Sequence, residues 1–314
     1  MKKKSSLFKR LFVGFLIGIS MVTLFGFLGS WWWGFDLFSS FRVQYFQLGL
    51  IGLGVTLWNR WHRLTIWAIA LICINYALVL PFYWNKPAPS NQPTIRVMLL
   101  NVNRANQQFD LIYTHIKNAD PDIVVLEEIT PQLATALEKL NPRYPHRFEQ
   151  IRTDCFGIAI LSKIPLENPH VIKTQDSEIP TLVTQIHSSQ GLLSIIATHP
   201  TPPVSQSLNA LHKRQLATLV QTVQQQTHPT ILVGDLNMSP WSAYFRPFLK
   251  DAALKNSMNG FGFQPSWPAQ IALLRTPIDH LLHDPRIKIQ HRFIGKEIGS
   301  DHLPLIVDLY LEND

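Results

Sequence analysis

The chain has 314 residues, of which 46% are hydrophobic and 16% are charged, and its formal net charge is +7. The basic excess lies in residues 1–94, which hold nine Lys or Arg and one acid, Asp36, whereas residues 95–314 hold 19 basic and 20 acidic side chains. The second part therefore lacks the basic surplus of a high-affinity duplex binder, and two distant cysteines, Cys73 and Cys155, support neither a disulfide framework nor a thiolate zinc site.

Residues 1–85 are predicted to form a membrane anchor that begins with one long apolar helix. Residues 11–29, LFVGFLIGISMVTLFGFLG, carry no charge and follow the basic residues Lys2–Lys4 and Lys9-Arg10. About 20 apolar residues match the thickness of the hydrocarbon core. A cleaved signal peptide is the alternative, but WWWGF follows where a small-residue cleavage site is expected, so an uncleaved helix with interfacial tryptophans is favoured.

Two further apolar runs follow, a short one at residues 45–58 and a longer one at 64–84. The basic residues Arg60 and Arg63 lie between them, so the positive-inside rule places this turn and the N-terminus in the cytoplasm. Three spans make a multi-pass membrane protein and carry everything after residue 85 out of the cytoplasm. If residues 45–58 do not span, the second domain returns to the cytoplasm; a buried core is the other interpretation of all three runs.

A polar, Pro-rich linker at residues 86–94, KPAPSNQPT, precedes a second domain at residues 95–314. In that domain short apolar strands alternate unevenly with helices, which predicts a two-layer or four-layer sandwich with mixed sheets. The predicted strands are 95–103, 122–130, 155–166, 181–189, 191–200, 227–237, 277–284 and 302–312, and the predicted helices are 109–120, 131–140 and 208–226.

Polar residues border nearly every one of these strands. Each motif alone is typical of a turn or a helix cap, but six of them in order are not explained by turn chemistry. Strand ends of α/β sheets converge on one edge, and a set of carboxylates and amides without thiolates favours Mg²⁺ or Mn²⁺. The residues are Asn101, Asn103, Glu127, Glu128, His199, Asp235, Asn237, Asp279, His280, Asp301 and His302.

Residues 95–310 resemble the endonuclease/exonuclease/phosphatase superfamily, which has the DNase I-like fold. The resemblance rests on LLNVN, DIVVLEEIT, FGIAILSK, ATHPTPP, VGDLNMSP, IDHLL and GSDHLPL. Together with the apolar N-terminal region, the chain is similar to membrane-anchored bacterial members. The resemblance implies an α/β (α+β) four-layer sandwich, in which helices flank two mixed β-sheets, and a Mg²⁺-dependent or Mn²⁺-dependent hydrolase of phosphate esters.

The resemblance also implies roles for particular residues. Glu127 would support the site from behind, and His280 would have a structural role. His302 would act as a general base or as a phosphate-binding imidazole oriented by Asp279, while His199 would bind the phosphate or assist the leaving group. The remaining roles are metal binding by Asn101, Glu128 and Asp301, and the holding of the attacking water and a phosphate oxygen by Asp235 and Asn237.

The chemistry agrees with these roles. A phosphodiester is anionic and repels hydroxide, and a divalent cation neutralises that charge and stabilises the transition state. Side chains separated by one residue project from the same side of an extended segment, so Asp235 and Asn237 are expected to face the same phosphate.

The substrate stays open between a nucleic acid, a phospholipid-type diester and a sugar or inositol phosphate monoester. The expected partners are this phosphate-ester substrate, nucleic acid or lipid head group, and the lipid bilayer; no protein partner can be inferred. Small basic patches at Lys213-Arg214 and at Arg143 with Arg147 are candidate contacts or solvated surface, and residues 261–270 form a substrate-facing or packed loop. A non-catalytic membrane module of the same fold is the rival hypothesis, disfavoured because every motif keeps its candidate ligands.

Overall fold

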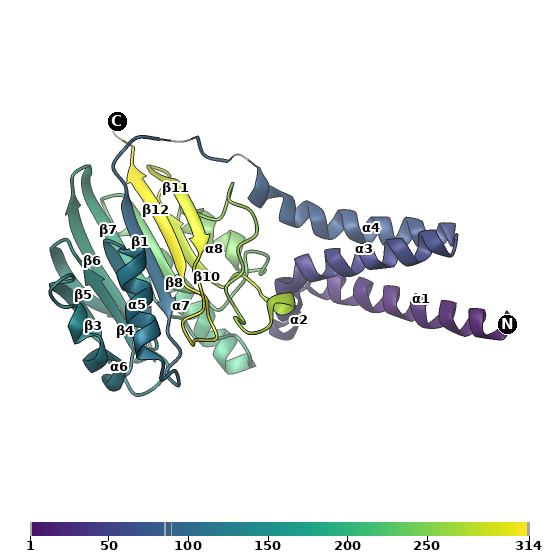
Figure 1. Ribbon diagram of the computed structural model, residues 1–314, viewed down its shortest axis with the longest axis horizontal. Coiled ribbons are helices and arrows are strands. Elements are labelled where there is room, and N and C mark those ends of the chain that lie inside the picture. Colours follow the sequence, from purple (N-terminus) through teal and green to yellow (C-terminus); the bar gives the residue numbers. More distant parts are fainter. Residues whose placement is uncertain (1, 85, 89, 313–314) are drawn as a thin grey trace.

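The computed structural model describes residues 2–84, 86–88 and 90–312, with side chains from Leu7 onward. The side chains of Lys2–Lys4, which the sequence places in a cytoplasmic basic cluster, lie outside this description. Two parts are visible: a body of two packed sheets flanked by helices, and a rod of long helices that projects from one side of it (Figure 1).

Three long helices lie side by side and form the rod, called the stalk below (Figure 1). The start of α1 and the turn between α3 and α4 lie at the end of the stalk far from the body. The short elements α2 and η1 lie where the stalk meets the body. In chain order these are α1 (Lys2–Phe25), α2 (Trp33–Leu37), η1 (Phe38–Phe41), α3 (Arg42–Trp58), α4 (His62–Val79) and η2 (Leu80–Tyr83).

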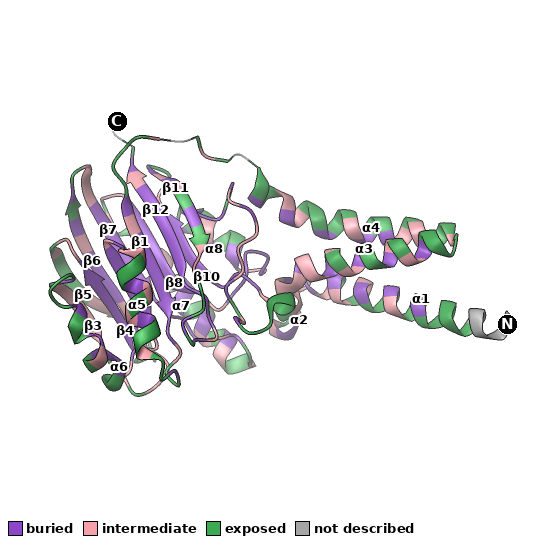
Figure 2. Cartoon of the chain, in the orientation of Figure 1, coloured by how far each residue is buried: buried purple, intermediate pink, exposed green. Residues whose placement is uncertain are grey.

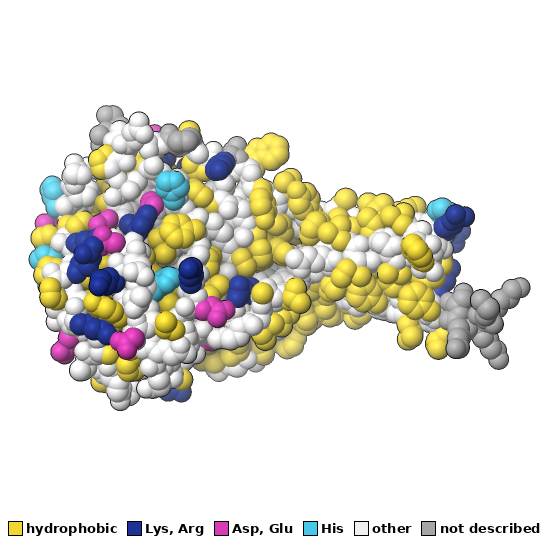
Figure 3. Space-filling view, in the orientation of Figure 1, with side chains coloured by type: hydrophobic (Ala, Val, Ile, Leu, Met, Phe, Trp, Pro, Cys, Tyr) yellow, Lys and Arg dark blue, Asp and Glu magenta, His cyan; other side chains and the backbone are white. Residues whose placement is uncertain are grey.

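The outer surface of the stalk is largely apolar (Figure 3), most of its residues are exposed or half-buried (Figure 2), and hydrogen bonds between polar side chains join its helices. Between its helices, Trp67 Nε1 donates to Ser20 Oγ at 2.9 Å, and Asn75 Nδ2 donates to Thr23 Oγ1 at 3.2 Å. Close helix approach relies on small residues: a Cβ added at Gly49 would lie 2.9 Å from Ile72 Cγ1. Polar contacts inside, small residues at the interface and apolar side chains outside are typical of helices in lipid.

Among the described residues, two helical stretches are long and apolar enough to cross a membrane, Leu7–Phe25 and His62–Tyr83. Of each stretch, 22% is buried inside the protein, so most of their surface faces outward. Helix α3 has 17 residues and does not meet the same length, and membrane crossing by any of the three helices stays a prediction.

Two six-stranded mixed sheets form the body, as predicted. Their orders are β11-β12-β1-β2-β4-β3 and β5-β6-β7-β8-β10-β9, and only β1/β2 and β7/β8 are parallel pairs. The strands are β1 (Ile95–Asn101), β2 (Ile123–Glu127), β3 (His146–Gln150), β4 (Ile158–Ser162), β5 (Leu166–Lys173), β6 (Pro180–Ser188), β7 (Gly191–Thr198), β8 (Thr230–Asp235), β9 (Lys255–Asn256), β10 (Asp279–His283), β11 (Ile287–Ile294) and β12 (Leu305–Leu311).

Helices cover the outer face of each sheet, so the body has four layers (Figure 1). Side chains of α5 and α6 pack with the outward residues of β1, β2 and β4, and those of α7 and α8 pack on β7, β8 and β10. The elements are α5 (Phe109–Ala119), α6 (Pro131–Ala136), η3 (Glu138–Leu140), α7 (Gln206–Gln224), α8 (Phe245–Asp251) and η4 (Ala272–Leu274).

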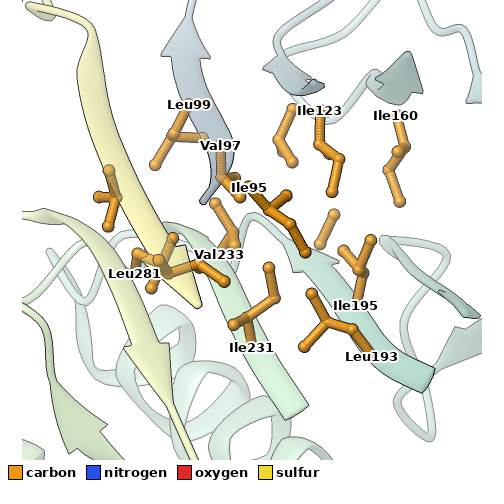
Figure 4. Close-up of a cluster of buried hydrophobic side chains, with 14 of the residues drawn as sticks. Ile95, Val97, Leu99, Ile123, Ile160, Leu193, Ile195, Ile231, Val233 and Leu281 are labelled. Atoms are coloured by element: carbon orange, nitrogen blue, oxygen red, sulfur yellow. The ribbon is translucent and has the colours of Figure 1, made fainter. Parts of the chain in front are cut away.

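The central core lies between the inner faces of the two sheets. Along β1, Val97 and Leu99 point into it, whereas Met98 and Leu100 point to the helices, so both faces of the strand are apolar. Figure 4 shows Ile123 and Ile160 of the first sheet facing residues such as Ile195 of the second. This core fixes how the strand ends of the two sheets meet.

Three strands that the sequence did not predict, β3, β5 and β11, lie at sheet edges, as does the two-residue β9. Their sequences, HRFEQ, LENPHVIK and IKIQHRFI, mix charges and a proline among the apolar residues. Edge strands carry such residues because these prevent pairing with another chain, which also removes the alternating pattern that would reveal a strand.

Candidate active site

The polar residues singled out by the sequence gather at one end of the sandwich. Strands β1, β2, β7 and β8 deliver them at their carboxyl ends, and β10 begins with Asp279. Strand β10 runs antiparallel to β8, so Asp279 pairs directly with Asp235, and Asn101 pairs with Glu127 across β1 and β2. The ends of β1, β2, β7, β8 and β10 therefore place these polar side chains in one shared site.

The Asp235 carboxylate lies at the centre of this site and is buried. Its Oδ1 accepts a hydrogen bond from the backbone N–H of Asn237 at 2.8 Å. Its Oδ2 lies 3.4 Å from Asn101 Nδ2, 3.7 Å from His199 Nε2 and 3.6 Å from His302 Nε2. One carboxylate oxygen thus faces an amide and two imidazoles that come from both sheets.

His302 and Asp279 form a buried pair, as the resemblance implies. His302 Nδ1 lies 2.9 Å from Asp279 Oδ2, which leaves Nε2 directed at Asp235. Burial lowers the pKa of His302, but the charges of Asp279 and Asp235 and the hydrogen bond to Asp279 outweigh it and raise the pKa to about 10. The imidazole is therefore a cation at neutral pH.

His199 has the opposite character. Burial lowers its pKa to about 4, helped by the charge of His302, so the ring is neutral at pH 7. Its ring lies 5.6 Å from that of Phe156. A neutral imidazole beside a cationic one gives the site two different hydrogen-bonding groups.

The three residues predicted as metal ligands do not all touch one another. Asn101 Nδ2 lies 3.3 Å from Glu128 Oε1, whereas Asp301 Oδ1 accepts a hydrogen bond from Asn103 Nδ2 at 2.7 Å. Glu128 and Asp301 nevertheless line the same cavity. The sequence noted Asn103 as a strand-end residue but assigned it no role; here it orients Asp301.

Among the described His, Cys, Asp and Glu side chains, one possible ligand atom from each of Asp235, Asp279 and His302 falls within 4.8 Å of the others. The Nδ1 of His302 already bonds to Asp279, so the trio is better described as a carboxylate–imidazole pair beside a second carboxylate. Glu128 accepts hydrogen bonds only from an amide and a backbone group, from Asn101 Nδ2 to Oε1 at 3.3 Å and from the backbone N–H of Arg104 to Oε2 at 3.0 Å, among the described residues.

The Glu127 carboxylate holds the backbone of Asp235 in place. Both its carboxylate oxygens accept from the backbone N–H of Asp235, at 3.0 and 3.1 Å, and the side chain is fully buried. Burial and the charges of Asp235 and Asp279 raise the pKa of Glu127 well above its ordinary value. Burial and Asp279 also raise the pKa of Asp235, to about 7, against the lowering effect of His302.

The backbone turns sharply where the side chains enter the site. Asn103, Glu128 and Asn237 all have left-handed φ angles, of 54°, 60° and 50°. Asparagine tolerates this conformation, but for glutamate it costs about 1 kcal/mol or more. The strain at Glu128 lets the chain leave β2 and hold its carboxylate beside Asn101.

Asn237 and His280 each bond to the backbone of the site. Asn237 Nδ2 donates to the carbonyl of Pro200 at 3.0 Å, which ties the GDLN turn to the loop after His199. His280 Nε2 lies 2.9 Å from the carbonyl oxygen of Met238 in the interior. Asn237 still lines the cavity, so its amide oxygen remains available to a ligand.

A cavity of about 480 Å³ opens over these residues. The size is within the range of ligand pockets. Trp267, from the loop 261–270, lines it and donates from Nε1 to Asp301 Oδ2 at 3.1 Å. Its wall also includes three residues from α2 and η1 that the sequence did not connect with the site: Leu37, Ser40 and Phe41.

Comparison with solved structures shows the same fold at low sequence identity. TDP2 from D. rerio, complexed with single strand DNA product, matches with a TM-score of 0.59 and 15% identity over 70% of this chain and 100% of that one. The 3′ phosphatase NExo from Neisseria, bound to product DNA hairpin, matches with a TM-score of 0.57 and 17% identity over 70% and 100%. An endonuclease/exonuclease/phosphatase from Beutenbergia cavernae matches with a TM-score of 0.55 and 18% identity over 71% and 72%.

No curated protein sequence matches the chain. The model of the Endonuclease/Exonuclease/phosphatase family matches residues 98–302, which run from β1 to His302 and contain every predicted site residue. The stalk, α2 and η1 lie outside this match. With its fold, its site and this match in agreement, the chain belongs to the endonuclease/exonuclease/phosphatase family.

Proposed function

We propose that the protein is a divalent-metal-dependent hydrolase of phosphate diesters, attached to a membrane. The observation that carries the proposal is the position of Asp235 Oδ2, which faces Asn101, His199 and His302 at 3.4 to 3.7 Å in a buried site with an open cavity above it. Such an arrangement directs groups that bind, orient and accept protons toward a water and a phosphate in the cavity.

The donor set fits a hard divalent cation. Glu127, Asp235 and Asp279 are buried together near Glu128, and burial and mutual repulsion raise the pKa values of Glu127 and Asp235. We assign Asn101, Glu128 and Asp301 as the residues that would hold Mg²⁺ or Mn²⁺. When bound, the cation neutralises the phosphate and stabilises the added charge of the transition state.

The chain's own groups then divide the remaining work. Asp235 accepts a proton from the attacking water, whose oxygen forms a bond to phosphorus while the ester P–O bond breaks. His302, held by Asp279, donates from Nε2 to a phosphate oxygen, and neutral His199 holds the leaving oxygen. The leaving oxygen takes up the proton that Asp235 accepted from the water, so the diester and water become an alcohol and a phosphate monoester.

The stalk is the proposed membrane anchor, with three spans. Because α3 lies along α4 and α1, a bilayer that encloses the two longer helices also encloses α3 (Figure 1). The exposed basic residues Arg60 and Arg63 lie in or next to the turn between α3 and α4, which is at the end of the stalk far from the body (Figure 1). Positive-inside logic then places the body outside the cytoplasm. Protease added to intact cells should cleave the body, and protection of the body would contradict this orientation.

The candidate substrates are a nucleic acid and a phospholipid-type diester. The DNA bound to TDP2 and NExo supports the former. The candidate basic patch of Arg143 and Arg147 does not support a nucleic acid, because both guanidinium groups are already paired with carboxylates. Arg143 Nε donates to Asp120 and Arg147 Nε donates to Glu149, each at 2.7 Å. A sugar or inositol phosphate monoester is the remaining alternative, which a substrate panel tests directly.

The full chain, purified in mild detergent, should hydrolyse bis(p-nitrophenyl) phosphate in the presence of Mg²⁺. Asp235→Asn should lower kcat at least about a thousandfold, because it removes the proton acceptor. Asp110→Asn is the matched control, since Asp110 is exposed, lies outside the cavity and pairs with Lys139 at the surface. An inactive wild type would favour the non-catalytic module, and an active Asp235→Asn protein would remove the proposed mechanism. Plasmid DNA, sphingomyelin and inositol phosphate complete the panel.

A further inference from the structure

The segment between the first two long helices is part of the cavity wall. Leu37, at the end of α2, and Ser40 and Phe41, in η1, line the same cavity as Asp235 and His302. These residues precede the family-matched region by more than fifty positions. The stalk therefore does more than tether the body, because its first connection closes one side of the site.

This connection is fixed to the body by Asp36, the one acid of residues 1–94. Its buried carboxylate accepts from Ser242 Oγ and from the backbone N–H of Ala243, both at 2.7 Å. Both partners lie just after the GDLN turn that carries Asp235. The hydroxyl of Tyr244 also donates a hydrogen bond to the carbonyl oxygen of Gly29 at 3.2 Å. The wall and the catalytic turn thus share one rigid support.

The wall is apolar and continues to the surface of the stalk. Leu37 is 39% exposed and Val204 is 53% exposed, although both line the cavity. Beyond them, Trp31 and Trp32 stand exposed at the junction of stalk and body. Exposed apolar side chains therefore occur both at the cavity and on the adjoining part of the stalk, where a soluble substrate does not need them.

The cavity also lacks the groups that bind a polyanion. None of the described residues that line it is Lys or Arg. Proteins that track a nucleic-acid backbone place these cations along it, since each phosphate must be neutralised. A site with one acidic, metal-binding end and one apolar wall instead fits a single phosphate attached to a hydrocarbon chain.

We propose that Leu37 and Phe41 form a subsite for the hydrocarbon chain of an amphiphilic phosphate ester drawn from the bilayer. This rests on the proposed hydrolase function and names its substrate class. The chain would lie against the stalk while its phosphate reaches Asp235 and His302. Water oxygen bonds to phosphorus, the P–O bond to the second alcohol breaks, and that alcohol leaves with one proton while the lipid phosphate remains.

The test compares two diesters with the same leaving group, p-nitrophenyl methyl phosphate and p-nitrophenyl dodecyl phosphate, on the full chain in mild detergent with Mg²⁺. The measured quantity is the ratio of kcat/KM for the dodecyl ester to that for the methyl ester. Leu37→Gln should lower this ratio at least about tenfold, because a polar group replaces the chain's contact surface. Asp36→Ala, which releases the wall from Ser242, should lower it as well.

Leu50→Gln is the matched control, since Leu50 is a similarly exposed leucine of the stalk (45%) that does not line the cavity. The dodecyl ester partitions into the detergent micelles to the same extent in the assays of Leu37→Gln and Leu50→Gln, so partitioning does not change the comparison. Equal ratios in wild type, Leu37→Gln and Leu50→Gln would overturn the subsite while hydrolysis of either ester preserves the hydrolase. Hydrolysis of neither ester would instead overturn the proposed function, and faster cleavage of a DNA hairpin than of the dodecyl ester would assign the cavity to nucleic acid.

Discussion

Acidification should destabilise the body through a histidine that holds the loop after His199. His212, on α7, is fully buried, and its Nδ1 lies 2.7 Å from the carbonyl oxygen of Thr201. Its Nε2 has no hydrogen-bond partner among the described residues, so a proton gained there finds no acceptor. Burial, helped by the charge of Lys213, lowers the pKa of His212 to about 4.

The sign follows from comparing the folded and unfolded states. The unfolded histidine has a pKa of about 6.5, so below that pH the unfolded state takes up a proton that the folded state refuses. The contribution of His212 is therefore present above about pH 6.5 and is lost as the pH falls toward 4. Between pH 8 and pH 5 the loss is about 1.5 pH units at 1.36 kcal/mol each, or about 2 kcal/mol.

A double difference isolates this loss from every other titrating group. The free energy of unfolding is measured for wild type and His212→Gln by urea denaturation, followed by tryptophan fluorescence in mild detergent, at about pH 8 and about pH 5. The destabilisation caused by His212→Gln should be about 2 kcal/mol smaller at the lower pH, because glutamine does not titrate. A destabilisation of equal size at both pH values would refute the reasoning.

Three further predictions address folding and the metal. Gly234→Ala should lower the free energy of unfolding by more than about 3 kcal/mol or prevent folding, because the new Cβ would lie 1.8 Å from the carbonyl oxygen of Thr198. The control is Gly54→Ala, since nothing lies within 4 Å of a Cβ at Gly54. Thermal unfolding followed by circular dichroism compares the two variants, and equal thermal stability would contradict the prediction. Ile160→Ala, in the core between the sheets, should lower the free energy of unfolding measured by urea denaturation by about 2–5 kcal/mol. Ile271→Ala, at an exposed position, should change the free energy of unfolding by no more than about 0.5 kcal/mol. Similar losses in the two variants would argue against the packing described. EDTA should abolish hydrolysis, and added Mg²⁺ should restore hydrolysis. Mg²⁺ should also raise the Tm of the protein, since a cation bound only in the folded state stabilises that state. Full activity in EDTA would exclude the metal role of Glu128.

Much of the body could be predicted from the sequence because its central strands are buried on both faces. Ile123–Glu127 and Thr230–Asp235 are nearly continuous apolar runs that end in polar residues, and such runs have few other interpretations. The edge strands escaped because their solvent-facing positions carry charges and a proline. For example, β5 follows the sequence LENPHVIK, whose pattern alone resembles a loop.

The candidate site was predictable as a set of residues but not as a set of contacts. The motifs placed Asp235, Asp279 and His302 at strand borders, which the structure brings together. They did not reveal that Asn237 Nδ2 bonds to the Pro200 carbonyl, or that Asp301 bonds to Asn103. Those partners come from different strands, and their distances depend on how the two sheets pack.

The sequence by itself determined the division into an apolar N-terminal region and a mixed α/β body, because hydrophobic periodicity and charge are local properties of the chain. Only the tertiary structure decided that Asp36 bonds to Ser242 and that Leu37 and Phe41 close the cavity above Asp235. Contacts that join positions about two hundred residues apart leave no local pattern, since they arise from the docking of one folded part onto another.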